Sequence, residues 1–506
     1  MFDNLLLGLT NVFMPVNFIA ISFGALLGLV VGAMPGLSAT MAIALLVPVT
    51  FAMRPETGIS MLSAIYMGAM YGGSIAAVLI RTPGTPSAAA TTMDGYPMAQ
   101  RGEPGRALGI SLIASFVGGL ISSMVLLTIA PLLGWVALMF GPVELFGVAV
   151  LGMTIIASLS QGSLVKGLLS GSLGLLFSTI GMDSITGIPR FTFGNIHLYG
   201  GIPFTVALIG LFSIPQAIRL IEREDTGKEA GAENRANKIT DRIVRPWSEV
   251  KELMPTFVRS AFIGVFTGII PGTGGDTACW FAYNEAKRRS DDKDSFGKGS
   301  PYGIAAPESA NNAVVGGALV PTITLGIPGS SSTAVLLGGL MIHGIMPGPT
   351  LMTEYAGVTY TLIWSVLLST IVMFVEGLAF TRACIAVTRV DNRLLSVAVV
   401  VLCVIGSFAI NNSLFEVGLM LMFGILGYFM DKVDVPVAPM VVGLILGSLL
   451  DVTMHQSLLI SGGSWLIFLK NPVCAVFLFI ALVSLIQTSP WYVRWRARRR
   501  FQKANT

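Results

Sequence analysis

Residues 28–36 read Gly-Leu-Val-Val-Gly-Ala-Met-Pro-Gly, and residues 264–272 read Gly-Val-Phe-Thr-Gly-Ile-Ile-Pro-Gly. The pattern GxxxGxxPG therefore occurs twice, and each copy interrupts a strongly apolar stretch. Two further pairs of Pro-Gly steps follow in the same order in both halves: Pro83-Gly84 with Pro328-Gly329, and Pro104-Gly105 with Pro347-Gly348. Helix breakers at matching places in two halves of a hydrophobic chain point to the binding site of a transporter.

The composition is that of a membrane protein. Of the 506 residues, 53% are hydrophobic and only 11% are charged, and the mean hydropathy is +0.77. A soluble globular chain carries about 25% charged residues. Because apolar runs of about 20 residues recur along the whole chain, we predict an all-α polytopic membrane protein with about 10–13 transmembrane segments. Some of the apolar runs are expected to be broken helices or re-entrant hairpins.

Charged stretches divide the chain. We predict a first transmembrane repeat over residues 1–221, a charged linker over 222–256, a second transmembrane repeat over 257–490 and a basic tail over 491–506. The tail holds five arginines and one lysine without an acid, directly after the last apolar run. By the positive-inside rule, the linker and the C-terminus are expected in the cytoplasm. The membrane setting makes a nucleic-acid partner unexpected. The start of the chain lacks a basic n-region, so we expect no removable signal peptide.

The second half contains a candidate hairpin. Charged residues lie on both sides of the apolar stretch 254–283, so two half-crossings would return the chain to the same face of the membrane. Proline removes an amide donor and glycine tolerates turn angles, which places the tip at Pro271–Asp276. A single kinked helix is the competing interpretation.

The two halves differ in one loop. The polar insert 284–307 corresponds to a tight turn at 53–57 in the first half. Two inverted repeats would produce this asymmetry, because their equivalent loops face opposite sides of the membrane.

Small or hydroxylated residues follow each break. A helix that starts after the break would aim its N-terminus at an anion, and carbonyls at the end of the preceding helix would suit a sodium ion. The candidate substrate-binding residues are Ser38, Thr40, Thr85, Ser87, Thr273, Asn311, Asn312, Ser330, Ser331 and Ser332. The candidate helix-break and ion-binding residues are Pro35, Gly36, Pro83, Gly84, Pro271, Gly272, Gly274, Gly275, Asp276, Pro328 and Gly329.

Each of these signals also has a purely structural interpretation. The glycines of the GxxxG patterns, such as Gly28 and Gly264, are expected to be helix-packing contacts. Asn311 and Asn312 would bind an ion or a carboxylate, or cap a helix. Arg81 would offset substrate charge or reach a membrane interface. Glu376 and Glu416 lie in apolar segments, as proton sites or as buried pairs, but neither belongs to the repeated pattern.

Enzyme signatures are weak. The stretch Pro271–Asp276 resembles a phosphate loop, but no Gly-Lys-Ser/Thr follows it. The three histidines, His197, His343 and His455, are far apart in the sequence, which argues against a zinc site. The four cysteines have no metal-ligand spacing. We therefore expect no enzyme activity, no cofactor and no metal apart from a coupling sodium ion.

Seven stretches resemble the large membrane subunit of the tripartite tricarboxylate transporter family. They are Gly32-Ala33-Met34-Pro35-Gly36-Leu37-Ser38-Ala39-Thr40, Tyr71-Gly72-Gly73-Ser74, Thr82-Pro83-Gly84-Thr85-Pro86, Met93-Asp94-Gly95-Tyr96-Pro97, Gly268-Ile269-Ile270-Pro271-Gly272, Ala306-Pro307-Glu308-Ser309-Ala310-Asn311-Asn312-Ala313 and Thr324-Leu325-Gly326-Ile327-Pro328-Gly329. The resemblance extends over nearly the whole chain.

The resemblance implies a multi-pass secondary transporter in the bacterial inner membrane. In that family, a periplasmic substrate-binding protein delivers a carboxylate, a small four-span membrane subunit accompanies the large one, and a sodium or proton gradient drives uptake. The resemblance does not identify the carboxylate. The competing hypotheses are an exporter or channel without a binding protein and, less favoured, a membrane-embedded enzyme. The transport mechanism is a further expectation. Because the breaks cluster in 28–105 and 264–348, we expect these segments to form a substrate domain that slides against a scaffold formed by 107–181 and 357–450. Rocking of the two halves about a fixed site is the competing mechanism.

Overall fold

The structure is a computed structural model that describes residues 2–34, 37–158, 164–183, 185–226, 239, 241–270, 274–387 and 392–488. Their regular secondary structure is almost entirely helical, as predicted. The exception is a short antiparallel hairpin of β1 (Gly181–Met182) and β2 (Pro189–Arg190). The C-terminal tail 491–506 lies outside the described residues.

The helices of the first half are α1 (Phe2–Val12), α2 (Pro15–Gly32), α3 (Ala39–Thr50), α4 (Pro55–Ile80), the 3₁₀ turn η1 (Pro86–Ala89), α5 (Thr92–Gln100), α6 (Pro104–Ala137), α7 (Pro142–Ser158), α8 (Leu164–Ser178), η2 (Ile196–Leu198), α9 (Phe204–Leu208), the π turn η3 (Ile209–Ser213) and α10 (Ile214–Thr226). Those of the second half are α11 (Trp247–Ile269), α12 (Gly274–Arg289), α13 (Pro301–Leu325), α14 (Ser331–Ile342), η5 (Pro349–Met352), α15 (Ala356–Val387), α16 (Asn392–Asn411), α17 (Leu414–Lys432), α18 (Ala438–Ile460), α19 (Ile467–Lys470) and α20 (Pro472–Thr488).

Seven helical stretches in the described residues are long and apolar enough to cross a membrane. They are Pro15–Gly32, Pro55–Ile80, Pro104–Ala137, Phe204–Glu222, Ala356–Thr381, Leu414–Lys432 and Ala438–Ile460, and shorter apolar helices such as α3 and α14 accompany them. The total of about 10–13 crossings stays a prediction, because the shorter helices can span only in combination.

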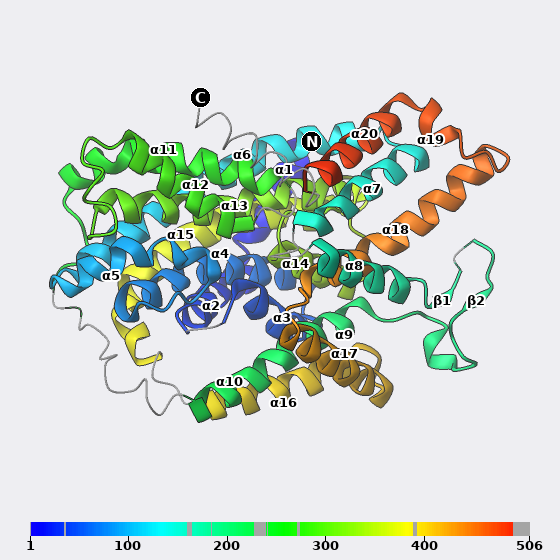
Figure 1. The fold of residues 1–506 in the computed structure, drawn as a ribbon, viewed down its shortest axis with the longest axis horizontal. Helices are drawn as coiled ribbons and strands as arrows, with labels where there is room; N and C mark the ends of the chain where they lie inside the picture. The colour runs from blue at the N-terminus through cyan, green and yellow to red at the C-terminus, as the bar shows by residue number, and fades with distance from the viewer. Residues whose placement is uncertain are drawn as a thin grey trace, which may run out of the picture.

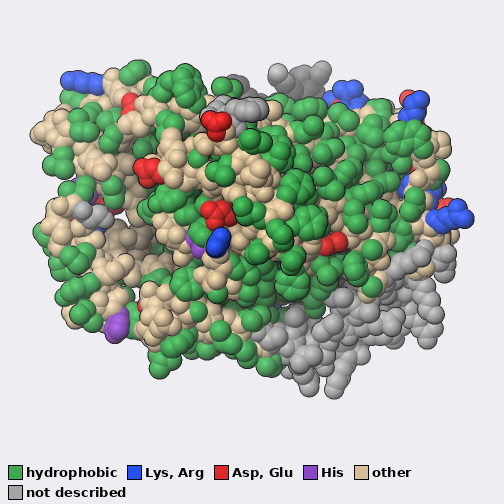
Figure 2. Space-filling model, turned by 180° about the vertical axis from the view of Figure 1, so that it is seen from behind, with side chains coloured by type: hydrophobic (Ala, Val, Ile, Leu, Met, Phe, Trp, Pro, Cys, Tyr) green, Lys and Arg blue, Asp and Glu red, His purple; other side chains and the backbone are tan. Residues whose placement is uncertain are grey.

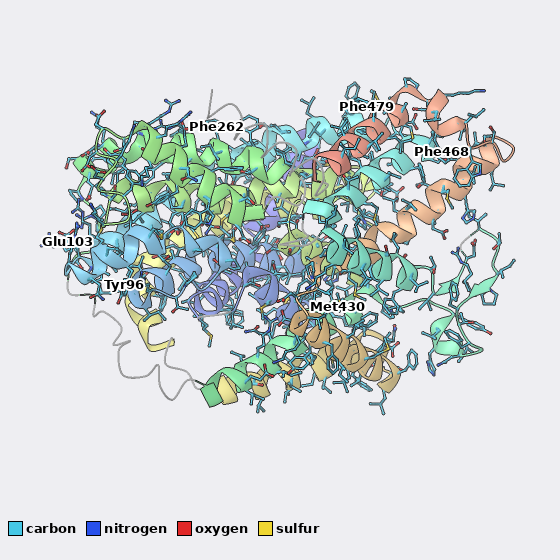
Figure 3. The ribbon with its side chains drawn as sticks, viewed as in Figure 1. Tyr96, Glu103, Phe262, Met430, Phe468 and Phe479 are labelled. Atoms are coloured by element: carbon cyan, nitrogen blue, oxygen red, sulfur yellow. The ribbon has the colours of Figure 1, made fainter. Side chains whose placement is uncertain are left out.

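The outer surface fits a lipid environment. Hydrophobic side chains cover much of the face in Figure 2, and lysines and arginines gather at one edge of it, the end where α5, α11 and α12 lie. Phe262 on α11 and Phe479 on α20 lie at the upper edge in Figure 3 and are 45% and 66% exposed. Large apolar side chains exposed in such number are costly in water and favourable in a bilayer.

In the first half, α2 and α3 form a hairpin on α4. Backbone of α2 meets α4 at Gly24 with Met61, Gly28 with Ile65 and Gly32 with Ala69, so the two helices run in the same direction. The other arm runs back, because the end of α3 at Thr50 meets the start of α4 at Gly58. The two arms are joined at residues 33–38.

In the second half, α11 and α12 form the same kind of hairpin on α13. Gly264 meets Ala310 and Gly268 meets Val314, so α11 runs parallel to α13. By contrast, Gly275 meets Asn311, and the Cys279 Sγ donates to the Pro307 carbonyl at 3.3 Å, so α12 runs antiparallel to α13. The predicted hairpin is confirmed, and the single kinked helix is wrong. The first three residues of the predicted tip, Pro271–Asp276, lie outside the described residues, and a re-entrant position in the membrane stays a prediction.

The two halves exchange their long helices. In one exchange, α15 lies along α4 in the same direction, with hydrogen bonds between the hydroxyls of Ser63 and Ser365 (2.8 Å) and between those of Tyr71 and Thr381 (2.9 Å). In the other, α6 lies along α13 in the same direction, with Gly118 against Ser309 and Ser122 against Gly316. Each half therefore supplies a long helix, α6 or α15, that packs on the central helix of the other half, α13 or α4.

This packing alters the expected division into a site and a scaffold. We expected 107–181 and 357–450 to form the scaffold as whole units, but α6 and α15 pack closely on the helices that carry the breaks, because small residues along α6 and α13 let their backbones meet. The helices α7, α8, α18 and α20 form a separate group, at the upper right in Figure 1, and α10, α16 and α17 form another at the bottom.

The charged linker is partly helical. Its first residues continue α10 to Thr226, and its last residues begin α11 at Trp247. Between them, the Asp241 carboxylate accepts from the amides of Gly105 and Arg106 at 2.6 and 2.8 Å. This carboxylate therefore caps the start of α6, where the amides of the first turn have no partner within the helix.

The contact between α6 and α13 yields a stability prediction. A Cβ at Gly118 would overlap the Ser309 carbonyl oxygen, whereas a Cβ at Gly418 on α17 would meet nothing within 4 Å. Gly118→Ala should destabilise the protein by about 1–3 kcal/mol through overpacking. The thermal unfolding midpoint in detergent should fall for Gly118→Ala and stay unchanged for Gly418→Ala. Equal midpoints for the two variants would contradict the close contact.

Candidate functional site

Helices begin directly after the breaks, as the sequence predicts. The Ser38 hydroxyl caps α3 by accepting from the Met41 amide at 3.3 Å. The Ser330 hydroxyl caps α14 by accepting from the Thr333 amide at 3.2 Å, and the Thr333 hydroxyl accepts from the Ser330 amide at 2.9 Å. Both serines therefore have a structural role at a helix N-terminus. The preceding Pro35 and Gly36 lie outside the described residues.

The N-termini of α3 and α14 meet. The hydroxyls of Thr40 and Ser332, each in the first turn of its helix, are hydrogen-bonded at 2.9 Å. The Tyr66 hydroxyl from the middle of α4 is hydrogen-bonded to Ser330 at 3.1 Å. Two helix N-termini from opposite halves of the chain thus share one cluster of hydroxyl groups, while Ser331 beside them is only partly buried.

The N-terminus of α12 meets the segment that follows the Pro83-Gly84 break of the first half. A Cβ at Gly275 would lie 3.2 Å from both the Ser87 Cβ and the Asn311 Oδ1, and 3.1 Å from the Met70 methyl group. Thr85 and Ser87 are hydrogen-bonded to each other at 3.1 Å. The residue before, Gly274, has a φ of 63°, which glycine adopts without strain.

These contacts define two clusters: the first is Thr40, Ser330 and Ser332, and the second is Thr85, Ser87, Gly275 and Asn311. Both clusters lie against one stretch of α4. Tyr66 touches the first cluster and Met70 the second, and residues four apart on a helix lie one above the other, about one turn away. Asp276 on α12 is close enough to Tyr66 to interact electrostatically. Three helix N-termini, those of α3, α12 and α14, therefore converge near the middle of α4.

The breaks leave no room for side chains. A Cβ at Gly84 would overlap the Gly32 carbonyl oxygen, and the Gly84 amide donates to the Gly73 carbonyl at 3.1 Å. In the second half, a Cβ at Gly329 would lie 2.6 Å from the Ala318 Cα. The two Pro-Gly segments, with Pro83 and Pro328, fold back against α4 and α13 in the same way.

The two asparagines are not caps. Asn311 and Asn312 lie inside α13 and are fully buried, and their Nδ2 groups donate to the carbonyls of Met70 (3.0 Å) and Met67 (3.3 Å) on α4. The capping interpretation is therefore wrong. The Oδ1 atoms of both have no hydrogen-bond partner among the described residues. A buried amide oxygen without a partner costs free energy unless a ligand or water supplies a donor or a cation.

The contacts also determine the roles of the GxxxG glycines and of Arg81. The glycines are packing contacts, because backbone of α4 or α13 lies where each Cβ would be. Arg81 ends α4 in a left-handed conformation and is exposed, with its guanidinium 5.7 Å from the centre of the Tyr96 ring. Its side chain therefore lies at the surface, whereas the hydroxyls of the clusters are buried.

The clusters can bind an anion without a basic side chain. Their described members include no Lys, Arg or His, so attraction for an anion would come from the helix N-termini and the hydroxyl donors. The amide oxygens of Asn311 and Asn312 suit a cation instead. Whether the residues selected from the sequence bind substrate or ion stays a prediction, and Thr273 lies outside the described residues.

Sequence reasoning missed four residues. Tyr66 and Met70 carry no signal in an apolar helix, and only the fold brings them to the breaks. Asp94 and Glu308 lie in stretches that support the family resemblance, and an acid in such a stretch is the signal that was available; the structure shows that both acids are fully buried.

Asp94 ties the two halves together beside the clusters. Its Oδ1 accepts from the amides of Gly297, Gly299 and Ser300 at 2.7–2.9 Å, and its Oδ2 accepts from the Tyr283 hydroxyl at 2.8 Å. Asp94 belongs to α5, the amides precede α13, and Tyr283 belongs to α12. One carboxylate therefore fixes α5, which follows the Pro83-Gly84 break, to the hairpin of the second half.

Removing this carboxylate should destabilise the protein strongly. Asp94→Ala would leave the buried amides of Gly299 and Ser300 without a partner, at about 1–3 kcal/mol each. Tyr283→Phe removes one hydrogen bond and should cost about 0.5–1.5 kcal/mol. Thermal unfolding in detergent should rank the variants in that order. A smaller loss for Asp94→Ala than for Tyr283→Phe would show that the carboxylate does not hold the loop.

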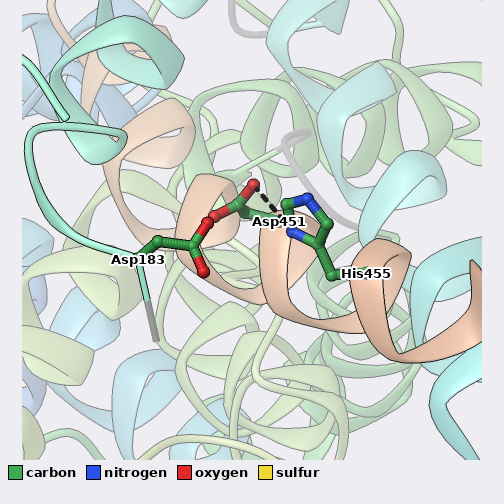
Figure 4. Close-up of side chains that lie close together, drawn as sticks. All are labelled: Asp183, Asp451 and His455. Carbon is green, nitrogen blue, oxygen red and sulfur yellow. Dashed lines mark ion pairs between the residues drawn. The ribbon is translucent and has the colours of Figure 1, made fainter. Parts of the chain in front are cut away.

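Among the described residues, one group of side chains has atoms that could ligate a metal ion: Asp183, Asp451 and His455. These atoms lie within 4.8 Å of one another (Figure 4). Arg190 on β2 already donates to both oxygens of Asp451, at 3.2 and 2.5 Å. The amides of Thr186 and Ile185, helped by Arg190, lower the pKa of Asp183 to about 2. With a guanidinium inside it, the cluster serves as an anchor between the β-hairpin and α18.

Comparison with known proteins agrees with this architecture. A family model described as "Tripartite tricarboxylate transporter TctA family" matches residues 18–442. A protein of Agrobacterium vitis described as "Uncharacterized 52.8 kDa protein in TAR-I ttuC' 3'region" is 34% identical over 487 residues, 96% of this chain and 95% of the relative. A second from the same organism, "Uncharacterized protein in TAR-II ttuC' 3'region", is 33% identical over 44% of this chain and 92% of its own length. No solved structure matches.

The model match covers most of the chain, and the first relative is similar over almost its whole length. The protein is therefore a multi-pass membrane protein and a transporter component rather than an enzyme. The chain belongs to the TctA family, the large membrane subunit of the tripartite tricarboxylate transporters.

Proposed function

We propose that this protein is the permease subunit that carries tricarboxylates or dicarboxylates across the bacterial inner membrane, driven by a sodium or proton gradient. A periplasmic substrate-binding protein and a small four-span membrane subunit are its proposed partners. The basic tail 491–506 favours a cytoplasmic C-terminus. The observation that carries the proposal is the convergence of three helix N-termini near the middle of α4.

A carboxylate suits such a site. Its oxygens accept hydrogen bonds from free amides and hydroxyls, and helix N-termini stabilise negative charge without a mobile countercharge. The hydroxyls of Thr40 and Ser332 hydrogen-bond to each other, and so do those of Thr85 and Ser87. Each pair is able to rotate its donors toward a ligand, because a hydroxyl both donates and accepts.

We further infer that residues 1–221 and 257–490 are two inverted repeats. Three matching features support this: a hairpin on a long helix (α2–α3 on α4, α11–α12 on α13), a Pro-Gly segment that folds back on that helix, and a long helix exchanged with the other half. Exchanged partners of this kind arise when two repeats are related by a two-fold axis. Inverted repeats place the substrate at their interface, near the bilayer midplane.

The transport proposal is tested by uptake of labelled citrate, tartrate and succinate. The protein would be reconstituted into vesicles with its membrane partner, with and without the binding protein, under a sodium gradient, a pH gradient or none. We expect uptake of at least one carboxylate that requires both the binding protein and a gradient. Uptake that needs neither would support a channel or an exporter, and no uptake under any condition would contradict the proposal.

The site is tested by removing single hydroxyls. Ser332→Ala and Ser87→Ala should each lower the apparent affinity for the carboxylate about 10- to 100-fold, since a hydrogen bond to a charged group contributes about 1.5–3 kcal/mol. Thr128→Val on the exposed face of α6 is the control, because its hydroxyl bonds only to carbonyls of its own helix. Uptake kinetics equal to those of the unaltered protein in both serine variants would remove these hydroxyls from the site.

A further inference from the structure

One buried acid is not used by the proposed carboxylate site. Glu308 lies on α13, one turn before Asn311, and its side chain is completely buried. Its Oε1 accepts from the Thr91 hydroxyl, and its Oε2 accepts from the Ser115 hydroxyl at 3.4 Å. The hydroxyls of Ser74 and Ser111 interact with the same carboxyl group. Four hydroxyls from three segments of the first half therefore surround one acid of the second half.

No cation balances this acid within the described residues. Lys, Arg and His form no ion pair with it, and Arg106 at the start of the neighbouring α6 is paired with Glu103 and Glu249. Cys279 of α12 interacts electrostatically with Glu308. The other titratable groups near the breaks on the helices packed against α13 are Asp276 of α12, Asp94 of α5 and Tyr71 of α4, and none of them carries positive charge. An ionised carboxylate in this setting would be a buried charge without a partner, which is strongly unfavourable.

A proton fits the surroundings better than a metal ion. The Ser74 and Ser111 hydroxyls are in direct contact at 2.7 Å, and the Thr91 hydroxyl contacts the carboxyl directly. An ion would have to separate these oxygens, whereas a proton needs no added space. Hydroxyls donate to a carboxylate and accept from a carboxylic acid, so the same four groups serve both protonation states after rotation.

The position of Glu308 connects it to the proposed carboxylate site. Thr91 directly precedes α5 and follows η1, the turn that carries Ser87. Asn311, whose Oδ1 lies beside Gly275, is on the same helix face one turn away, and Ser87 lies against Gly275 as well. A change in the charge of Glu308 would therefore act on the segments that form the second cluster.

We propose that Glu308 is the residue that binds the coupling proton of this transporter. This inference rests on the proposed carboxylate uptake and deepens it. Protonation neutralises the acid inside the protein, and release of the proton to the cytoplasm lets the emptied protein return. The group gains and loses one proton per cycle, with no other bond made or broken.

The test separates exchange from accumulation. Glu308→Gln resembles the protonated acid in shape and charge. In vesicles containing both membrane subunits and the binding protein, the variant should still exchange internal unlabelled for external labelled carboxylate at equal pH. Accumulation driven by a pH gradient should fall at least tenfold. Glu376→Gln on α15, also an acid inside the apolar region, is the matched control and should retain accumulation.

Four results would overturn the proposal or its basis. Accumulation by Glu308→Gln under a pH gradient, or its loss in Glu376→Gln alone, would place the proton elsewhere. Accumulation by the unaltered protein under a sodium gradient but not a pH gradient would leave carboxylate uptake intact and remove the role of Glu308 in proton coupling. Failure of the unaltered protein to take up any carboxylate would contradict the proposed function instead.

Infrared spectroscopy gives a readout that does not depend on transport. The purified protein should show a carbonyl band of a protonated carboxylic acid that disappears in Glu308→Gln and persists in Glu376→Gln. Thr91→Val keeps the shape of the side chain but removes one hydroxyl, so it should shift the position of this band. A spectrum of Glu308→Gln identical to that of the unaltered protein at every pH would refute a protonated Glu308.

Discussion

The rest of the structure depends on one constraint: a helix that ends inside a membrane leaves amides and carbonyls that need partners. Each described break meets this need locally. Ser38 and Ser330 cap the helices that follow, the Gly84 amide bonds to the Gly73 carbonyl, and the Gly329 amide bonds to the Thr322 hydroxyl at 3.2 Å. The N-termini of α3, α12 and α14 are the groups that we propose bind the carboxylate. The proposed carboxylate site and the structural solution are thus made of the same groups.

Close backbone packing is what brings these N-termini together. Glycines of α2 and α11 let these helices approach α4 and α13 until a methyl group would not fit. In a bilayer such contacts replace the hydrophobic effect as the source of helix association, because lipid tails are as apolar as the side chains. A contact of the same kind holds α6 on α13, whereas hydrogen bonds between hydroxyls, such as Ser63 with Ser365, join α15 to α4. Motion of the site relative to a scaffold would therefore have to occur at the boundary with α7, α8, α18 and α20, or with α10, α16 and α17.

Polar groups inside this core divide into two kinds. Asp94 is saturated with three amides and a hydroxyl, which makes it a fixed structural anchor. Glu308 meets only hydroxyls, which accommodate either protonation state. The difference lies in the donors: an amide hydrogen cannot rotate away from a carboxylate, whereas a hydroxyl hydrogen can. The surroundings of an acid, rather than its burial, thus distinguish an anchor from a proton site.

The sequence by itself determined the membrane class, the positions of the breaks and the hairpin around residues 271–276, because hydropathy and Pro-Gly steps act locally along the chain. It also identified Ser38, Thr40, Ser87 and Asn311 as residues of interest. Only the tertiary structure decided which breaks meet, since contacts such as Thr40 with Ser332 join residues remote in sequence. It decided likewise that Asn311 and Asn312 lie inside a helix, and that Tyr66, Asp94 and Glu308 lie beside the site. Their roles come from neighbours supplied by other helices, and no local pattern encodes those neighbours.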